Sequence, residues 1–440
     1  MRSSISRKRI VTVAFLTFFS VALLLQITIS PTMFCSNFFY ELPPPKAEGF
    51  SRNLSLSHDS LIIYRAYLDL RKLTKVRILA FSRCFADDAT VKIGSEVAQI
   101  VAIEKSCPWK WAPSCDWNSF YISAKRPLQV ENSGRVQVSL PHLNRSISIS
   151  LSVLSSDSRS LSSGLSICVP PLYWFSNWPL LVHFFELWRL QGATHFFVYV
   201  HSVSVSVRSV LGFYFQKGLV TVVPWNELPS TTDVNPNLSL YRLGHSLAHN
   251  DCVFRTTSRF TALVDIDEFL IPSRNQTLLE LLDDKLEKHP LAGSFVFTHI
   301  RLRFDGQDWS KPDFSWLRRS LKSDKWKGPT KYVFIADRTR ILLTHQVHSH
   351  FPPFSPIMIS HEEAHLYHAR SSWAAPNAHE EFEPIKLYTE ESIQAVKKSF
   401  DEVGAFLTSP RTDIHLPNKI VSDLVVKCLS SRNSSDYVVL

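Results

Sequence analysis

Residues 260–272 read FTALVDIDEFLIP. The stretch begins with a short, largely apolar run that ends in the β-branched Val264, a pattern typical of a buried strand. Three acids, Asp265, Asp267 and Glu268, follow at once, and apolar residues then resume. Because the flanks are apolar, the acids belong to a segment that is otherwise buried, which argues against a solvated turn.

An Asp-x-Asp pair at the end of a strand suits a hard divalent cation. In open α/β sheets, ligands bind just beyond the carboxyl ends of the strands. Mg²⁺ and Mn²⁺ prefer oxygen ligands and often share them with substrate phosphates. The sequence therefore predicts that Asp265 and Asp267 hold Mn²⁺ or Mg²⁺ against the diphosphate of a nucleotide-sugar. The pair is a common pattern in itself, and a turn after a core strand is the alternative.

The amino terminus predicts a membrane anchor. Residues 1–9 carry four basic side chains and would form a cytosolic tail, while residues 10–30 are uncharged and long enough to span a bilayer. A cleaved signal peptide is the alternative, although Ser-Pro-Thr-Met after Ile29 is a poor cleavage site. Either way, the rest of the chain would lie in the secretory lumen or outside the cell. Glycosylation sequons agree with this compartment and begin at Asn53, Asn144, Asn237, Asn275 and Asn433.

Three regions and a tail follow the predicted anchor. Residues 31–58, with three consecutive prolines, read as a stem, and residues 59–165 read as a β-rich N-terminal domain that ends in a serine-rich linker. Residues 166–420 alternate helices with strands, which predicts an α/β fold with a parallel sheet and crossover helices. Residues 421–440 form the C-terminal tail. The helices expected in the α/β region cover 178–190, 205–216 and 238–256, and its strands include 195–200, 219–223, 260–264 and 294–302.

Composition narrows the function classes. The chain has 440 residues, which is long enough for more than one domain, and its hydrophobic fraction of 45% is enough for a large core. Its formal charge is +9. Lys and Arg are scattered and not clustered with stacking aromatics, so a nucleic-acid partner is not expected. Neither a Gly-x-Gly-x-x-Gly nor a P-loop motif is present, which leaves the dinucleotide and P-loop classes without support. The positive charge suits anionic nucleotide diphosphates and acidic membrane surfaces, or simply aids solubility.

Seven cysteines are present, and six of them, all but Cys35, form an even set suited to an oxidising compartment. Their pairing cannot be read from the sequence. We expect at least one bridge within the β-rich domain, where Cys107 and Cys115 could close a short loop. No Cys-x-x-Cys occurs, so a thiolate zinc site is not expected.

Three ordered blocks of sequence carry a family resemblance. The first is CVPPLY at 168–173 with FFELWRLQGATHFFVY at 184–199, the second is NDCVFR at 250–255 leading into DIDEF at 265–269, and the third is LYHAR at 366–370. Together they resemble glycosyltransferase family 92, once called domain of unknown function 23, over roughly residues 168–400. The segment AYLDLR at 66–71 is similar to the family's amino-terminal part. Ala369 stands where the family usually has a Tyr between His and Arg, which puts that ring's acceptor or phosphate contact in doubt.

The resemblance implies a GT-A-like fold, a Rossmann-type mixed sheet with flanking helices, in a single-pass type II protein of the Golgi membrane. It implies a UDP-sugar donor, with a lean to UDP-galactose, and a glycan or glycoprotein acceptor. Asp265 and Asp267 match the family's metal motif, and His345 best matches its late histidine, which would complete the metal site. His368 and Arg370 are suited to contact the diphosphate and offset its departing charge.

Further site residues have open roles. Glu268 could face the sugar or only brace the loop. Asp251 could reach the donor sugar, or it could form a cap or a salt bridge with Arg255 or Arg259. Arg255 could instead face phosphate, since its guanidinium makes bidentate contacts.

An inverting transfer needs a carboxylate that deprotonates the acceptor hydroxyl. Asp305 and Asp308, which follow the strand expected at 294–302, are the candidates, and Glu362 and Glu363 are the alternatives.

Three function classes compete. The first is a Golgi glycosyltransferase that moves a hexose, galactose from UDP-galactose, onto a glycan with inversion. The second is a membrane-anchored glycan-binding or interaction protein derived from an inactive transferase, which the Ala369 departure keeps open. The third is a glycoside hydrolase with Asp265 and Glu268 as its carboxylates. These acids are too close in sequence for an obvious arrangement on two sides of a sugar ring.

Overall fold

The computed structural model describes residues 60–407, with gaps at 73, 85–89, 105–106, 109, 111, 126–133, 155–161, 308–313, 324–327 and 370–381. The predicted cytosolic tail, membrane anchor, stem and C-terminal tail lie outside the described residues. No helix in the described part of the chain has both the length and the apolar character needed to cross a membrane.

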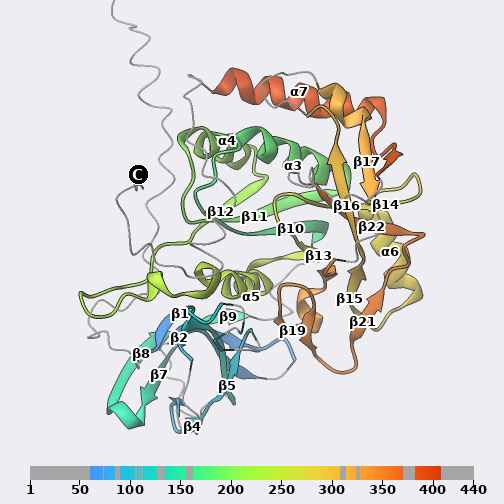
Figure 1. The fold of residues 1–440 in the computed structure, drawn as a ribbon. Coiled ribbons are helices and arrows are strands. Elements are labelled where there is room, and N and C mark those ends of the chain that lie inside the picture. The colour runs from blue at the N-terminus through green and yellow to red at the C-terminus, as the bar shows by residue number, and fades with distance from the viewer. Residues whose placement is uncertain are drawn as a thin grey trace, which may run out of the picture. The chain divides into compact units, whose positions relative to one another are not determined.

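A seven-stranded mixed sheet forms the centre of the α/β region (Figure 1). Its strands, in spatial order, are β12 (Val220–Pro224), β11 (Ala193–Val200), β10 (Ser162–Leu172), β13 (Ser258–Leu263), β18 (Lys331–Phe334), β15 (Ala292–Phe297) and β21 (Ser355–Met358). The first four are mutually parallel, as the sequence predicts. Strand β18 is antiparallel to both β13 and β15, which makes the sheet mixed. Strand β10 begins at Ser162, inside the stretch predicted as a linker.

Helices cover both faces of this sheet. Helices α3 (Trp178–Leu190) and α4 (Val205–Gln216) have the predicted bounds because Asn177 and Ser204 cap their first turns. Together with α7 (Glu390–Phe406) they lie on one face, and α5 (His245–Arg255) lies on the other (Figure 1). The indole of Trp178 stacks on Phe400 of α7 at 4.9 Å between ring centroids.

The long helix predicted over 238–256 is only partly correct. Its first half is two 3₁₀ turns, Pro236–Leu238 and Tyr241–Gly244, and α5 begins at His245. Arg242, Leu243 and Gly244 all have positive φ values, of 47°, 49° and 76°, and a right-handed helix cannot continue through them.

A second sheet of five strands adjoins the first. Its order is β14 (Glu268–Pro272), β22 (Ala364–Ala369), β16 (His299–Phe304), β17 (Ser320–Ser323) and β23 (Glu383–Ile385). The strand predicted over 294–302 is therefore two strands. The strand is interrupted at Thr298, where the chain passes from β15 in one sheet to β16 in the other. Helix α6 (Leu278–Lys288) follows β14 and starts with a capping box between Thr277 and Glu280.

The N-terminal region is β-rich, as predicted, and contains two sheets. One has the order β5 (Gln99–Ala102), β6 (Trp117–Lys125), β2 (Lys75–Arg83), β1 (Ile62–Asp69) and β9 (Ser152–Leu154). The other has the order β4 (Glu96–Val97), β3 (Lys92–Ile93), β7 (Arg135–Leu140) and β8 (Arg145–Ser150). Buried side chains from both sheets form one cluster, so the region has its own core.

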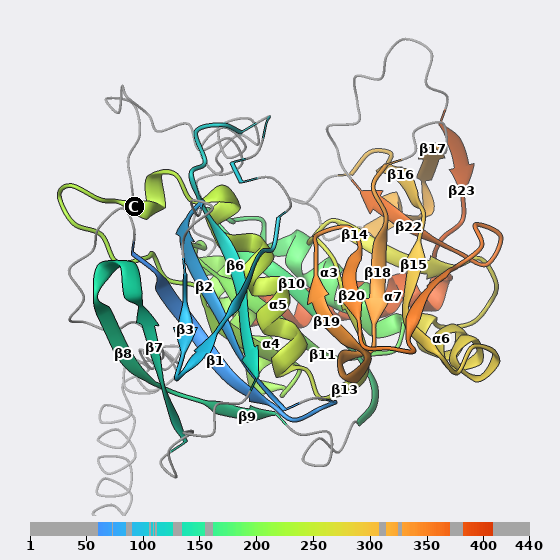
Figure 2. The same ribbon diagram turned by 90° about the horizontal axis from the view of Figure 1, so that it is seen from below.

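The N-terminal sheet also shares a second core with the α/β region. Figures 1 and 2 both show β1 and β2 beside α5. The ring of Tyr67 lies 4.4 Å from that of Phe254 on α5, and Tyr64 lies 4.9 Å from Trp225, which follows β12. Their apolar cluster extends to the hairpin of β19 (Thr339–Leu342) and β20 (Val347–His350). The burial of these apolar side chains holds the two regions together.

A buried charge cluster strengthens the same contact. The side chain of Asp69 is fully buried and accepts hydrogen bonds from Arg71, at 2.9 and 3.0 Å, and from Arg77. Arg71 reaches across the boundary and donates to the carbonyl oxygen of Ala336 at 2.6 Å. Burial opposes the ionisation of Asp69, but the hydrogen bonds and charges of the two arginines hold its pKa below the ordinary value.

Disulfides are present in both regions. Cys84, directly after β2, is bonded to Cys107, which confirms the expected bridge within the N-terminal domain. The suggested Cys107–Cys115 pair is wrong, because the sulfur of Cys107 is already bonded to Cys84, and Cys115 forms another disulfide. A further bridge, Cys168–Cys252, joins β10 to α5.

We predict that Asp69→Asn lowers the free energy of unfolding by about 3–5 kcal/mol, because it leaves two buried guanidinium groups without a carboxylate. Urea unfolding of the purified chain measures this change. The matched control is Asp116→Asn, since Asp116 pairs with Arg83 at 2.8 Å where both side chains are about 40% exposed. The control should cost at most about 1 kcal/mol. Equal effects from the two variants would contradict the prediction.

Candidate active site

The three acids lie where the chain passes from one sheet to the other. Strand β13 ends at Leu263, and Glu268 opens β14 of the second sheet. Along the chain, β10 is followed by β11 and β12, which lie on one side of it in the sheet, whereas the next parallel strand, β13, lies on its other side. The boundary between β10 and β13 is therefore the topological switch point of the parallel strands. Ligands of open α/β sheets bind at such a point. The predicted position of the acids at a strand end is therefore confirmed.

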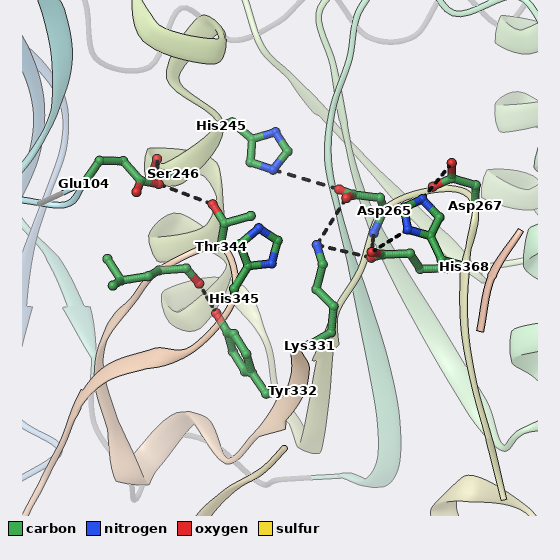
Figure 3. A network of polar contacts seen from close by, with 12 residues as sticks. Glu104, His245, Ser246, Asp265, Asp267, Lys331, Tyr332, Thr344, His345 and His368 are labelled. Carbon is green, nitrogen blue, oxygen red and sulfur yellow. Dashed lines mark hydrogen bonds and ion pairs between the residues drawn. The ribbon is translucent and has the colours of Figure 1, made fainter. Parts of the chain in front are cut away.

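A buried lysine lies between two of the acids. The side chain of Lys331, the first residue of β18, is 1% exposed, and its ammonium lies 3.2 Å from Asp265 Oδ2 and 3.2 Å from Glu268 Oε2 (Figure 3). Burial opposes the ionisation of Asp265, yet the Lys331 charge holds its pKa well below the usual range. For Glu268, burial outweighs the lysine and raises the pKa.

Glu268 braces the loop. Its Oε2 accepts a hydrogen bond from the backbone amide of Asp265 at 2.8 Å, and its side chain is only 4% exposed. Of the two roles open for this residue, the hydrogen bond supports the bracing role. The backbone carbonyl of Glu268 is held as well, because it accepts from Trp188 Nε1 at 3.1 Å.

His368 joins the site from β22, where it lies directly opposite Glu268 in the strand register. Its Nε2 is 3.2 Å from Asp267 Oδ2, and its ring stacks on His299 at 4.9 Å. The next residue, Ala369, donates its backbone amide to the carbonyl of Asp267 at 2.7 Å. That contact needs no side chain, so the replacement of Tyr by Ala leaves it intact.

Asp267 and His368 have a spacing suited to one divalent cation. Two ligand atoms that each lie about 2.1 Å from a metal at right angles are about 3 Å apart, close to the 3.2 Å seen here. Asp265 faces Lys331 instead. Within the described residues, no cluster of three or more His, Cys, Asp or Glu is arranged to hold a metal ion. The described chain would thus supply two ligands and leave the others to water and substrate phosphate, as is usual for Mg²⁺.

His345, predicted as a metal ligand, lies on the other side of Lys331 from Asp267 (Figure 3). Its Nδ1 faces the carbonyl oxygen of Thr330 at 3.3 Å, and the Thr330 hydroxyl donates to its carbonyl at 2.8 Å. Burial and then the Lys331 charge lower the pKa of His345 to about 4. The structure therefore does not bring His345 together with Asp267 and His368.

Asp251 and Arg255 form a buried network away from the acids. Asp251 accepts hydrogen bonds from the hydroxyls of Tyr67 and Tyr199, each at 2.7 Å, and pairs with Arg255 one helical turn later. Of the roles considered for Asp251, the structure shows the salt bridge. The opposite end of α5 meets the site, where His245 Nε2 is 4.0 Å from Asp265 Oδ1.

The remaining predicted residues are less central. Asp305 is exposed in the turn after β16, where its amide donates to the carbonyl of Arg319 at 3.0 Å. Strand β16 is parallel to β22, so Asp305 follows the same end of the sheet at which Ala369 lies. Asp308 and Arg370 lie outside the described residues. Glu362 is exposed, and Glu363 pairs with Lys285 at 2.6 Å.

The sequence did not predict three residues of the site, namely Lys331, His245 and His249. Lys331 gives no readable signal, since a lysine at the start of an apolar strand is commonly at the surface. The histidines repeat at i, i+4, a spacing that places two side chains on one face of a helix and could have been noticed.

Comparison with known proteins shows the family of the chain. A family model described as glycosyltransferase family 92 matches residues 163–403, more than half of the chain. The chain belongs to glycosyltransferase family 92. The matched region of this family 92 chain starts within β10 and ends within α7, so it leaves out the N-terminal sheets.

Two curated relatives and two solved structures are similar to this family 92 chain. The family 92 protein F13G3.3 of Caenorhabditis elegans is 26% identical over 298 residues, 65% of this chain and 55% of the relative, and F55C10.4 of the same organism is 26% identical over 157 residues, 34% and 29%. The chain thus spans about half the length of F13G3.3. S. aureus TarS and its 1–349 fragment in complex with UDP both have a TM-score of 0.26, at 13% and 11% identity. They cover 47% and 60% of this chain, which covers 37% and 69% of theirs.

We predict that Lys331→Met lowers the free energy of unfolding by about 3–5 kcal/mol, because it leaves the buried Glu268 carboxylate and the partly exposed Asp265 carboxylate without their cation. Adding Glu268→Gln should recover part of the loss, since one of those charges is then removed. Urea unfolding of both single variants and the double variant forms a double-mutant cycle. Strictly additive losses would show that the two residues are not coupled.

Proposed function

We propose that this family 92 member transfers a hexose from a UDP-sugar, galactose from UDP-galactose, to a hydroxyl of a glycan or glycoprotein. The observation that carries the proposal is the loop of Asp265 to Glu268 at the switch point of the parallel strands, with His368 beside Asp267. A nucleotide-sugar transferase needs carboxylates at this place to meet a diphosphate through a cation. The GT-A-like interpretation of the mixed sheet rests on the same arrangement.

The site residues have different roles in this proposal. Asp267 and His368 would hold Mn²⁺ or Mg²⁺, which when bound offsets the charge on the departing diphosphate. Lys331 keeps Asp265 and Glu268 in place, and the Glu268 carboxylate fixes the amide at the start of the loop. Such a rigid arrangement is what charge stabilisation in a transfer reaction requires.

Transfer with inversion also needs a base for the acceptor hydroxyl. We place it on the segment that follows β16, with Asp305 and Asp308 as candidates. The support is positional, because β16 and β22 are parallel and end at the same edge of the sheet as His368. An exposed carboxylate there is open to an acceptor that arrives from solvent.

We further propose a Golgi type II membrane protein with a lumenal catalytic region. Asn144 and Asn275 are exposed and free to carry glycans in that compartment. Asn237 is held instead, since its amide oxygen accepts from the Leu228 amide at 2.7 Å and its nitrogen donates to the Leu228 carbonyl at 2.9 Å.

We therefore predict that Asn144 and Asn275 are glycosylated and Asn237 is not. Expression of Asn144→Gln and Asn275→Gln should each increase electrophoretic mobility by one glycan, whereas Asn237→Gln should leave mobility unchanged and reduce secreted yield. Intact-mass analysis before and after glycosidase treatment checks the counts. A chain without any glycan would remove the support for a lumenal location.

We predict that Asp267→Asn reduces turnover of UDP-galactose with Mn²⁺ by at least about a hundredfold, because a carboxylate that holds a catalytic metal contributes several kcal/mol. Its melting temperature should stay near that of the parent. Asp265→Asn is the comparison: it loses the Lys331 pair, so it should lower the melting temperature as well. Near-normal turnover by Asp267→Asn, insensitive to a chelator, would exclude the metal role and favour the glycan-binding alternative.

A further inference from the structure

Helix α5 carries two buried histidines for which the described residues provide no hydrogen-bond partner. The side chain of His245 is 8% exposed and His249 is 1% exposed, and none of their four ring nitrogens is hydrogen-bonded within the described part of the chain. The rings pack edge to face, 4.3 Å apart. Native proteins rarely leave buried polar atoms unsatisfied, so each such group calls for an explanation such as a ligand.

His245 lies at the first turn of α5, and this helix end has no side-chain cap. Its N-cap residue, Gly244, has no side chain to offer, whereas α3, α4, α6 and α7 are capped by Asn177, Ser204, Thr277 and Thr389. The first-turn amides of a helix point outward with a partial positive charge. They favour an anion, and phosphate above all.

The described surroundings of His245 do not form a metal site, because they hold no group of three or more His, Cys, Asp or Glu arranged around a metal ion. His245 Nε2 and the Lys331 ammonium both face Asp265, at 4.0 and 3.2 Å (Figure 3). Neutral imidazole offers one N–H donor, and a phosphate oxygen is a fitting acceptor.

We propose that the amino-terminal end of α5 binds one phosphate of the donor's diphosphate, with His245 as a hydrogen-bond donor. This inference rests on the proposed function and extends it to residues of the preceding helix. Asp267 and His368 would meet the diphosphate through the metal ion. His249 packs against the His245 ring from one turn deeper and fixes its orientation, which makes it a positioning residue.

The test measures binding of UDP, uridine and inorganic pyrophosphate to the full-length chain by calorimetry, with a chelator present to remove metal contributions. His245→Phe keeps a flat ring against His249 but has no donor, whereas His245→Gln keeps a donor and loses the ring. His195, bonded to Thr221 at 2.8 Å near the start of β11, provides the matched control pair, His195→Phe and His195→Gln. Melting temperatures verify folding.

We expect His245→Phe to weaken UDP and pyrophosphate binding about ten- to a hundredfold, the usual effect of losing a hydrogen bond to a charged group. His245→Gln should retain more affinity than Phe, and uridine binding and the His195 variants should be unchanged. The inference is overturned if His245→Phe binds UDP and pyrophosphate as tightly as the parent does. It is also overturned if His245→Gln binds more weakly than His245→Phe, because a role in packing alone predicts that the variant that keeps the ring binds more tightly.

The two proposals fail in different ways. If the parent chain binds pyrophosphate with the expected His245 dependence but does not bind UDP, the phosphate site stands and the UDP donor is wrong. If the parent binds UDP and neither His245 variant changes the affinity, the donor stands and the phosphate site is wrong. Should His245→Phe fail to fold, His249→Phe provides the same readout, with a smaller expected loss because it acts through His245.

Discussion

The arrangement of the site depends on one buried ammonium group. Lys331 lies between Asp265, at the end of the first sheet, and Glu268, at the start of the second. Two carboxylates so close together, with Glu268 buried, would repel each other and resist ionisation. The lysine removes that repulsion and holds the loop at both ends. Asp267, between them in sequence, faces His368.

Lys331 reaches this place through the topology of the sheet. Strand β18 is inserted between β13 and β15 and is antiparallel to both. Its first residue therefore lies at the edge where β13 ends. Without that insertion the Asp265–Glu268 loop would have no buried cation, so the mixed character of the sheet has a direct chemical result.

The sequence predicted the helices and strands whose bounds are marked by residues within or next to the element itself. Helix α3 could be bounded because Pro179 lies near its start and Gly192 follows its end. Gly192 has φ near 90°, and Leu279 lies too close to admit a Cβ there. The strand before Asp265 could be read from its apolar run. The broken start of α5 could not, because Arg242 and Leu243 are ordinary residues in a left-handed conformation.

The features that were missed depend on contacts between distant parts of the chain. Lys331 is 66 residues from Asp265, and the disulfide partners Cys168 and Cys252 are 84 residues apart. No spacing rule encodes such pairs. The site carboxylates were found because they are adjacent in sequence, and the lysine that stabilises them was not because the fold alone brings it there.

The N-terminal sheet reaches close to the candidate site. Phe81 packs so tightly on Gly244 that a Cβ there would lie 2.4 Å from its ring, and Glu104 accepts hydrogen bonds from Ser246 at 2.6 Å and Thr344 at 3.2 Å (Figure 3). The α/β region therefore depends on the N-terminal region for part of the packing around α5. A chimera that joins the α/β region to a foreign N-terminal domain would lose the wall behind α5. Changes at Phe81 or Glu104 would therefore disturb the amino-terminal end of α5.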